Sequence, residues 1–437
     1  MIDGDRWLRL PGASVKLASK SAISDSRGVA QILVPKRRPL RVTVSAPGYG
    51  TLSAEEDFRA HRKVTLRLYR TDLQWPLYGA TDSRTQAQVH IQLRPPFHAV
   101  WARSLHGLIE FPAVVSGGVA YIGNARATVR AISMADGSVL WSHPTPHAKM
   151  ASSPAVVGST LVYHDMRGRV WILDRASGRA LWKRRFPSPI ESSPIVVSGV
   201  DYFGTWDGRL YALDLKTRRL KWSRSLGAKI TASAAISGGT LYIGDYAGRL
   251  WALALKSGKT RWVGQVNGRI YGTSAISSGR VFVPSSNGDS LTAFSTSGRE
   301  LWRFSSSGYV YSSPAAWEGR VFVGSYNGLL SALAARSGKV LWSVDTGGPI
   351  SGAAVVVSGV VYAGSFSGQI FGVDAKSGRV LLRFKHGHYV PVSGDGGQLL
   401  FHGYSTLFAM QPVLRKRKAA TPARAAAAAP RQTPSKP

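Results

Sequence analysis

The 437-residue chain contains no cysteine. This excludes disulfides, thiolate metal sites, c-type haem attachment, a cysteine nucleophile and a lipid-anchoring cysteine. No run of eighteen apolar residues occurs either, so the sequence predicts no transmembrane helix. The N-terminal segment reads MIDGDRWLRLPGASV and lacks the apolar core of a signal peptide. We therefore expect either a cytoplasmic protein or one whose leader has been removed or precedes Met1.

Acidic residues are scarce. The chain has 23 Asp and Glu against 56 Lys and Arg, which gives a formal net charge of +33. Such a charge favours polyanionic partners, namely nucleic acid, anionic lipid or an anionic wall polymer. The alternative is a basic proteome in which every surface is basic. No recognition motif accompanies the charge, so nucleic-acid binding has no support beyond it.

A regular series of tryptophans runs along the chain. Its members follow one another at intervals of 40 or 41 residues, and Leu382 continues the series at the same interval. A fixed interval in this range is typical of repeat architectures. We predict that these side chains are structural docking groups between neighbouring repeats. The series is Trp101, Trp141, Trp182, Trp222, Trp262, Trp302 and Trp342.

Each repeat reads as four short strands. Between Ile190 and Trp222 the strand-like segments are IESSPIVVSG, VDYFGT, RLYALDL and RLKW, separated by turns. Asp207-Gly208 suits a two-residue hairpin turn, which needs positive φ. Ser-Gly pairs such as Ser257-Gly258 close the following hairpin. Four antiparallel strands in about 40 residues are the pattern of a β-propeller blade.

A second, apolar series supports this register and is expected to open the first strand of each repeat. It consists of Leu108, Met150, Ile190, Ile230, Ile270, Val310, Ile350 and Val390. Because first strands line the central channel of a propeller, we expect an apolar layer there. The repeats predict eight blades over residues 97–413. The last blade has only three strands of its own, so the strand around Trp101 is predicted to close the ring.

The repeats resemble those of a known family. The pattern Ala-x-Asp-x-x-Thr/Ser-Gly-x-x-x-Trp is similar to the tryptophan-docking motif of PQQ-type propellers, a family that includes BamB-like envelope proteins and quinone-dependent dehydrogenases. It is represented here by Ala212, Asp214, Thr217 and Trp222, with Arg218 in the glycine position. The resemblance implies an all-β fold, an eight-bladed β-propeller of four-stranded antiparallel blades.

Two segments precede the propeller. Residues 1–70 alternate apolar and polar positions in GASVKLASKSAISDSRGVAQILV and LRVTVSAPGYGTLS, as half-buried strands do. With Asp25, Gly28 and the SAPGY of Ser45 to Tyr49, they resemble a small transthyretin-like, carboxypeptidase-regulatory-like β-sandwich, which implies a spacing or adhesive role. Residues 71–96 are a linker, in which WPLYGATDSRT, Trp75 to Thr85, resembles the lead-in of PQQ-type propellers.

The final segment, residues 414–437, is basic and rich in Ala and Pro, without periodicity. This composition predicts a disordered tail. The cations from Arg415 to Lys418 could hold a polyanion. The alternative is a tail that is merely solvated.

The dehydrogenases of this family imply adjacent cysteines in a disulfide, acidic and amide ligands for calcium, a catalytic Asp and a Trp beneath the quinone. This chain has no cysteine and only six Glu. Glu110 and Glu191 are the two that lie near first-strand starts, and neither has a second acid spaced to share a hard cation. We therefore expect no catalytic residues, no cofactor and no metal site.

Other candidate motifs have structural explanations. The SSP triplets at residues 152–154, 192–194 and 312–314 recur at one blade position, which favours a structural role. His386 and His388 would point both rings to one face of a strand, as metal ligands can. Without a third ligand, we interpret them as surface histidines.

The residues beside the apolar series should lie at the mouth of the channel. Aromatic and basic groups together suit protein or glycan ligands and anions. Inter-blade packing with scattered surface charge is the alternative. The candidate binding residues are Lys149, Glu191, Lys229, Arg269, Tyr271, Tyr309, Tyr311 and Tyr389.

The leading hypothesis is a non-enzymatic binding or scaffold protein. Resemblance to BamB-like proteins implies protein partners and an extracytoplasmic place at the bacterial cell envelope. The chain departs from BamB itself in its sandwich module, its basic tail and its lack of an anchoring cysteine. A quinone (PQQ)-dependent dehydrogenase relative and a polyanion-binding protein, acting on an anionic envelope polymer or lipid, are the alternatives. We expect a monomer.

Overall fold

The computed structural model describes residues 1–33, 38–59, 63–146 and 148–413. These residues form strands and one short 3-10 helix, η1 (Thr71–Leu73). The tail predicted for residues 414–437 lies outside the described residues. In the part of the chain that is described, no helix has the length and apolar character needed to span a bilayer.

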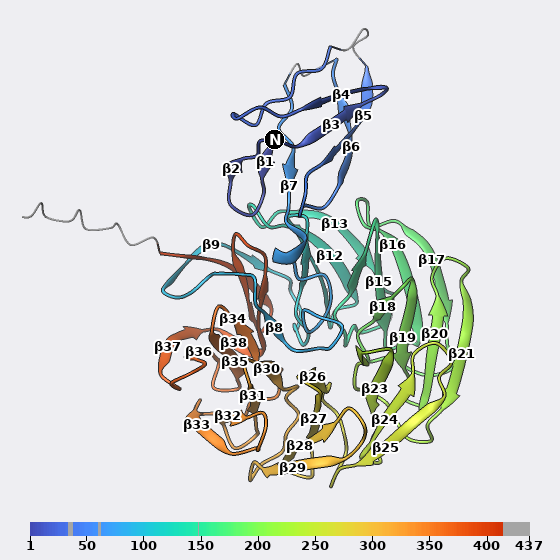
Figure 1. Cartoon of the computed structure of the whole chain (residues 1–437), viewed down its shortest axis with the longest axis vertical. Coiled ribbons are helices and arrows are strands. Elements are labelled where there is room, and N and C mark those ends of the chain that lie inside the picture. Colours follow the sequence, from blue (N-terminus) through green and yellow to red (C-terminus); the bar gives the residue numbers. More distant parts are fainter. Residues whose placement is uncertain (34–37, 60–62, 147, 414–437) are drawn as a thin grey trace, which may run out of the picture.

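Antiparallel sheets follow one another around a ring in chain order, coloured from cyan through green and yellow to red (Figure 1). Within each blade, four strands or, in the last blade, three strands pair in sequence order, so the blades are built mainly from local hairpins. Such a ring of four-stranded antiparallel sheets is a β-propeller, as the 40-residue repeats predict.

The first four blades have these strands: β10 (Val114–Ser116), β11 (Val119–Asn124), β12 (Thr128–Ser133) and β13 (Val139–Pro144); β14 (Ala155–Val157), β15 (Thr160–Asp165), β16 (Arg169–Asp174) and β17 (Ala180–Arg185); β18 (Ile195–Val197), β19 (Val200–Gly204), β20 (Arg209–Asp214) and β21 (Arg219–Ser225); β22 (Ala235–Ser237), β23 (Thr240–Gly244), β24 (Arg249–Ala254) and β25 (Thr260–Gln265).

The next three blades continue the pattern: β26 (Ala275–Ser277), β27 (Arg280–Ser285), β28 (Ser290–Ser295) and β29 (Glu300–Ser305); β30 (Ala315–Trp317), β31 (Arg320–Gly324), β32 (Leu329–Ala334) and β33 (Val340–Asp345); β34 (Val355–Val357), β35 (Val360–Ser365), β36 (Gln369–Asp374) and β37 (Val380–Lys385).

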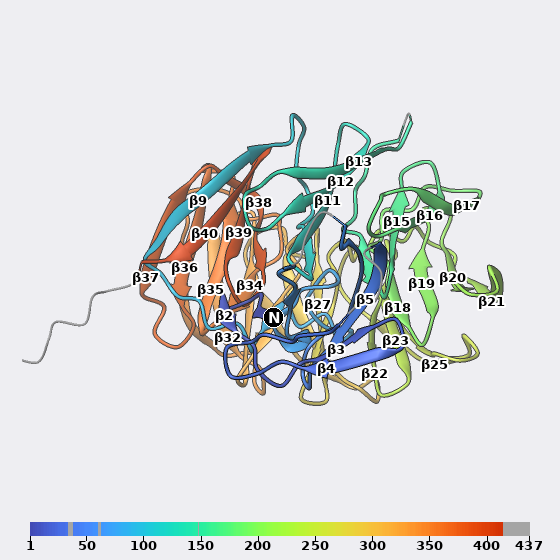
Figure 2. The ribbon, with the colours of Figure 1, turned by 90° about the horizontal axis from the view of Figure 1, so that it is seen from above.

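The last blade joins the two ends of the repeat region. It contains β38 (Gly387–Gly394), β39 (Leu399–Gly403), β40 (Thr406–Pro412) and β9 (Phe97–Ser104). Strand β9 pairs antiparallel with β40, with Trp101 opposite Ala409. Figure 2 shows this cyan strand beside the red one. The chain-distant strand that the sequence assigns to the last blade thus pairs with it and leaves β40 no open edge.

The first strands are shorter than the sequence suggests. In the blade of Trp222, only Ile195–Val197 pair with the next strand, whereas the expected strand began at Ile190. The Ser192 hydroxyl instead donates to the carbonyl of Gly204, and the Ser193 N–H donates to the next blade. These polar contacts divert residues 190–194 from the ladder.

One member of the apolar series was predicted wrongly. The N–H of Ala125 bonds to the carbonyl of Leu108, as that of Tyr246 bonds to Lys229, which directly precedes the series residue Ile230. Ile109, which is 1% exposed, is therefore the first member of the series. The error arose because the loop after Leu105 is one residue out of step with the later repeats.

Each docking tryptophan of the following set donates its indole N–H to a backbone carbonyl in the next blade, at 2.8–3.3 Å: Trp101 to Met134, Trp141 to Arg175, Trp222 to Leu255, Trp262 to Thr296, Trp302 to Ala335 and Trp342 to Ala375. A glycine with positive φ lies beneath the ring. A Cβ on Gly258 would come within 2.8 Å of the Trp222 ring, so a side chain there would displace the indole. The equivalent residue 36 positions after Trp182 is Arg218, at φ 62°.

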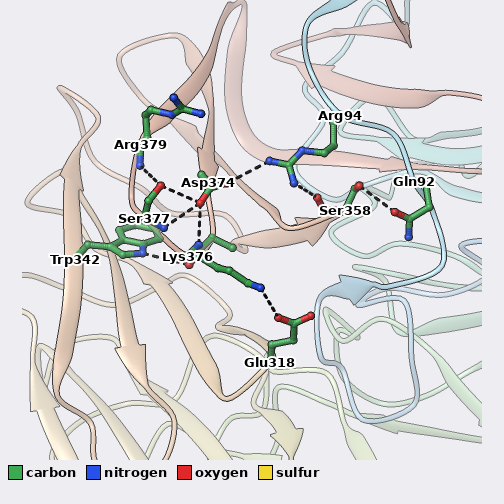
Figure 3. Close-up of polar contacts among 10 residues, drawn as sticks. Gln92, Arg94, Glu318, Trp342, Ser358, Asp374, Lys376, Ser377 and Arg379 are labelled. Atoms are coloured by element: carbon green, nitrogen blue, oxygen red, sulfur yellow. Dashed lines mark hydrogen bonds and ion pairs between the residues drawn. The ribbon is translucent and has the colours of Figure 1, made fainter.

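Figure 3 shows one such joint, where Trp342 meets the turn that follows Asp374. The Asp374 carboxylate accepts hydrogen bonds from the N–H and hydroxyl of Ser377, which fixes the turn. Arg94, from the segment before the propeller, donates to Asp374 at 3.2 Å and to the Ser358 carbonyl at 2.9 Å. The segment before the propeller is therefore fastened to the outer part of this blade.

The N-terminal residues form two small sheets outside the ring, drawn in blue at the top of Figure 1. One sheet has the order β2 (Leu8–Arg9), β1 (Ile2–Asp3), β7 (Arg67–Leu68), and the other β4 (Lys20–Ile23), β3 (Ser14–Leu17), β5 (Pro39–Ser45), β6 (Leu52–Asp57). Val15, Val42, Val44 and Leu68 belong to a hydrophobic cluster separate from those of the propeller. This part of the chain therefore has a core of its own.

Buried carboxyl groups lie at the junction of these sheets with the propeller. Asp5 accepts hydrogen bonds from the Arg70 N–H at 2.7 Å and the Gln74 amide at 3.1 Å. Burial raises the pKa of Asp5 to about 6. Asp395, in the turn between β38 and β39, is 4% exposed, and burial raises its pKa to about 7. The charge of Asp5 adds to the rise in the pKa of Asp395, and the charge of Asp3 adds to the rise in the pKa of Asp5.

Candidate binding site at the centre of the propeller

A lead-in segment, Trp75 to Gln88, runs along the inner edges of the blades and reaches the centre of the ring (Figure 1). Its backbone bonds to first strands at 2.8–2.9 Å, in the pairs Trp75–Val115, Pro76–Val156, Asp82–Ile236, Ser83–Ile276, Thr85–Ala316 and Gln86–Val356. Its end, β8 (Ala87–Gln88), pairs with β34. Because first strands are inner edges with free N–H groups, this segment satisfies them and crosses the channel.

Arg84 anchors the lead-in segment. Its guanidinium is fully buried and donates to the carbonyls of Ala234 at 3.0 Å and Pro194 at 3.0 Å, and also to that of Tyr78. Burial lowers the pKa of Arg84 to about 10, so it remains charged at neutral pH. The carbonyl dipoles around it replace the water that a buried cation loses. One cation thus ties the lead-in segment to two blades.

Hydroxyl groups link the blades around the channel. The backbone N–H of one blade donates to the hydroxyl 40 residues later, at 2.9–3.1 Å, in the pairs Ser153–Ser193, Ser193–Ser233, Ser233–Thr273 and Thr273–Ser313. The Tyr78 phenol donates to Ser313 at 3.0 Å. These contacts support the structural interpretation of the SSP triplets.

The channel opens into a cavity of about 420 Å³, which we call the central mouth. Tyr78 of the lead-in segment belongs to its lining. The acidic and further aromatic residues in the lining include Glu110, Glu191, Tyr271, Tyr311, Tyr326, Phe366 and Tyr389. The mouth is therefore a recess with a floor rather than an open pore.

Glu191 is held firmly in the mouth. It is 8% exposed, and its two carboxylate oxygens accept hydrogen bonds from the Trp206 indole at 2.9 Å and the Tyr271 phenol at 2.8 Å. Burial, with the charge of Glu191, raises the pKa of Tyr271, so the phenol stays a donor at neutral pH. Both oxygens are engaged by the protein itself.

Glu110 occupies the same repeat position as Glu191, directly after the series residue. Burial, and then the charge of Glu191, raise the pKa of Glu110, while Lys149 lowers it. No hydrogen bond or ion pair reaches Glu110 from the residues that the structure describes. Its charge also raises the pKa of Tyr271 and Tyr389, which places it close to both rings.

Aromatic rings form a continuous arc around the mouth. The ring centroids lie 5.4 Å apart for Tyr271 and Tyr311, and 4.9 Å apart for Tyr311 and Tyr326. The arc continues over 6.0 Å from Tyr326 to Phe366 and over 5.2 Å from Phe366 to Tyr389. Such edge-to-face and tilted contacts hold the rings in place.

Cations surround the mouth without lining it. The Lys229 ammonium lies 3.4 Å from the Trp206 ring centroid and 5.0 Å from that of Tyr246. Arg269 lies 5.7 Å from the Tyr246 centroid. These are cation–π contacts, in which the ring face attracts the positive charge.

The residues predicted as the binding mouth lie together. Four of them line the cavity, namely Glu191, Tyr271, Tyr311 and Tyr389. Tyr309 is 49% exposed and contacts the rings of Tyr311 and Tyr326, so it lies at the rim. Lys149 acts electrostatically on Glu110, and Lys229 and Arg269 lie over Tyr246.

The sequence reasoning missed a series of aromatic residues at this mouth. Trp206, Tyr246 and Tyr326 lie two residues after the end of the second strand of their blades, and Phe366 directly follows the second strand of its blade. They are multiples of 40 residues apart, close to the interval of the docking tryptophans. A search for further series at the same interval would have found them.

A second cavity of about 630 Å³ lies beside the last blade and is lined by His386, His388, Tyr404 and Phe408 among others. His388 stacks on Phe366 at 4.6 Å, and burial lowers its pKa. His386 stacks on Phe408 at 5.6 Å. Among the described residues, no group of three or more His, Cys, Asp or Glu could hold a metal ion.

The ring of antiparallel sheets around this central recess defines a β-propeller. A family profile described as outer membrane protein assembly factor BamB matches residues 125–278 and 265–387, which together are more than half of the chain. The chain belongs to this family. No curated protein sequence shows significant similarity to it.

Solved structures share the fold at low identity. BamB from Moraxella catarrhalis has a TM-score of 0.62 and 17% identity, covering 72% of this chain and 99% of that chain. Quinohemoprotein alcohol dehydrogenase from Comamonas testosteroni has a TM-score of 0.67 and 13% identity, covering 80% of this chain and 82% of that chain. A europium-containing methanol dehydrogenase has a TM-score of 0.65 and 13% identity, covering 75% of this chain and 89% of that chain. These likenesses show the fold alone.

The residues of the mouth do not fit a quinone with its hard cation. Such a cation takes six or more oxygen ligands, mainly from carboxylates and carbonyls. Both oxygens of Glu191 already accept hydrogen bonds from the protein, and Glu110 is the other carboxylate in the lining. The chain also has no cysteine from which to build the disulfide that the dehydrogenases imply.

Proposed function

We propose that the protein is a non-enzymatic binding or scaffold protein of the bacterial cell envelope, and that the central mouth receives its partner. One observation carries the proposal. The lead-in segment closes the channel behind Tyr78 and leaves an aromatic recess on a rigid ring. Half-buried aromatic side chains in a preformed pocket are where binding energy concentrates in protein interfaces.

The rest of the chain supports this role. We propose that the ring has eight blades and that the N-terminal sheets form a transthyretin-like sandwich that serves as a spacer. Asp5 of these sheets meets the turn after β38, whereas Tyr389 at the mouth lies near the start of that strand. The sandwich therefore leaves the mouth accessible. We propose a monomer without a cofactor, in keeping with the family likeness to BamB.

Photocrosslinking from inside cells tests the proposal. A photoreactive phenylalanine at Tyr309, on the rim, is compared with one at Val139, which is 43% exposed on the outer strand β13. We expect one discrete crosslinked protein in the envelope fraction from position 309 and not from position 139. The same products from both positions, or none from either, would contradict a partner at the mouth.

A dye-linked assay tests the dehydrogenase alternative. The full chain is incubated with the quinone PQQ and Ca²⁺, and oxidation of alcohols and sugars is followed. We expect no turnover, because the carboxylates of the mouth do not fit the cation. Saturable turnover would overturn the scaffold function.

A further inference from the structure

The lining of the central mouth has charges of one sign. The chain contains 56 Lys and Arg against 23 Asp and Glu, yet the charged residues that line the mouth, within the described ranges, are Glu110 and Glu191. Lys229 lies outside the lining, with its ammonium over Trp206. An acidic recess in a strongly basic protein selects for a positively charged ligand by local charge complementarity.

The two carboxylates differ in what they can offer. Each oxygen of Glu191 already accepts one hydrogen bond, from Trp206 or Tyr271, which holds the carboxylate in place. Glu110 has no hydrogen-bond or ion-pair partner among the described residues, although it is partly buried among rings. A carboxylate in such surroundings is costly until a cation pairs with it.

The aromatic arc offers faces for a cation. At one repeat position, Trp206 and Tyr246 already hold an ammonium, that of Lys229. Tyr326 and Phe366 occupy the same position in later repeats. No Lys or Arg of the described residues lies over either of these two rings. The blade scaffold thus presents a cation–π platform that the protein fills on one side of the mouth and leaves open on the other.

We propose that the central mouth binds an alkylammonium group, supplied by a lysine side chain of a partner protein, between Glu110 and the rings of Tyr326 and Phe366. This inference rests on the proposed function, since it names the chemistry by which the mouth recognises its partner. An organic cation fits better than a metal ion, because the walls are aromatic and the described residues include no group of three His, Cys, Asp or Glu side chains that could hold a metal. The volume of about 420 Å³ lies in the range of ligand pockets.

Calorimetry on the purified full chain tests the proposal with three probes. They are N-acetyl-lysine methylamide, its norleucine analogue, which lacks the ammonium, and n-butylammonium as a free amine. We expect the lysine derivative to bind saturably and at least about tenfold more tightly than the norleucine analogue, the factor that roughly 1.4 kcal/mol of charge recognition gives. We expect n-butylammonium to bind more weakly than the lysine derivative.

Matched variants locate the site. Glu110→Gln should weaken the binding of the lysine derivative about tenfold. It should not lower the melting temperature, because the substitution removes a charge that has no partner among the described residues. Glu300→Gln is the control, because Glu300 lies on the outer strand β29 and pairs with Arg303. Tyr326→Phe should keep the affinity and Tyr326→Ala should lose it, because the ring face and not the phenol binds.

The outcomes separate this inference from the proposed function. Equal affinity for the lysine and norleucine derivatives, or an unchanged affinity in Glu110→Gln, would overturn the ammonium site. Equal affinity for n-butylammonium would overturn the assignment to a protein lysine. In either case, a partner protein crosslinked from position 309 would still support the proposed scaffold function. If no partner protein were crosslinked from position 309, the scaffold function would be contradicted as well.

Discussion

The phenol of Tyr271 donates a hydrogen bond of 2.8 Å to the carboxylate of Glu191, which lies 80 residues earlier in the chain. The bond joins two blades that are not neighbours, across the mouth. Tyr271→Phe should lower the free energy of unfolding by about 1.5–3 kcal/mol, as for a lost hydrogen bond to a charged group. Urea denaturation measures it. Tyr309→Phe, at the exposed rim, is the control, and equal losses in the two variants would contradict the structural role of the bond.

Arg84 and Arg94 give a matched pair in one segment. Arg84 is fully buried, with backbone carbonyls as partners, whereas Arg94 is about half exposed and pairs with Asp374 (Figure 3). We expect Arg84→Met to cost about 3–5 kcal/mol, because it leaves buried carbonyls unpaired. Arg94→Met should cost about 1 kcal/mol or less, as exposed ion pairs do. If Arg84→Met and Arg94→Met lowered the denaturant midpoint equally, Arg84 would not be the residue that fastens the lead-in segment to the blades.

Trp222 tests the docking joint. Its indole donates to Leu255 of the next blade and its ring covers Gly258. We expect Trp222→Ala to destabilise the fold by about 3–5 kcal/mol, as large-to-small changes in packed sites do. Binding at the mouth should be unchanged at temperatures where the variant is folded. A melting curve like that of the wild type would refute the joint.

Arg218 stands where the other docking turns have glycine. Its φ of 62° is in the left-handed region, as are those of Gly258 at 65° and Gly338 at 72°. A side chain in this conformation costs roughly 1–2 kcal/mol, which glycine avoids at some cost in unfolded-chain entropy. Arg218→Gly should therefore raise the melting temperature slightly. Lys216→Gly, in the same turn, is the control and should lower it.

The junction carboxyls predict a dependence of stability on pH. Because burial raises the pKa of Asp395 to about 7, the folded state holds this proton more tightly than the unfolded state does. The stabilisation is complete below the unfolded pKa of about 4 and is lost as the pH rises through about 7. Asp395→Asn keeps the acceptor for Gly397 and Gln398 without the charge.

We therefore expect the free energy of unfolding of Asp395→Asn, relative to that of the wild type, to rise by up to about 4 kcal/mol between pH 4 and pH 8. This is the size that a rise of about three units in the pKa of Asp395 implies. The measurement is the difference in unfolding free energy at each pH. Asp25→Asn is the comparison, because Asp25 is exposed and its lowered pKa gives the opposite direction. A difference that does not grow with pH would show that Asp395 is not buried as a carboxyl.

The sequence alone determined the propeller. Apart from the closing strand β9, each strand of a blade pairs with a neighbour in the chain, so the repeat interval and the turns determine the fold. The tryptophan series located the joints because each indole meets the same turn of the next repeat. The polar and aromatic residues beside the apolar series could also be placed at the mouth, as residues at equal repeat positions share one face of the ring.

The tertiary structure decided what the repeats do not encode. The lead-in segment has no periodicity, so only the folded chain shows that Arg84 and Tyr78 close the channel and turn it into a recess. The register of the first blade, in which Ile109 and not Leu108 is the first member of the apolar series, depends on backbone hydrogen bonds across a loop of irregular length. Likewise, Glu191 and Tyr271 meet only because the ring curves, and the free carboxylate of Glu110 follows from the same curvature. Local patterns determine blades, whereas contacts across the ring axis depend on closure of the whole ring.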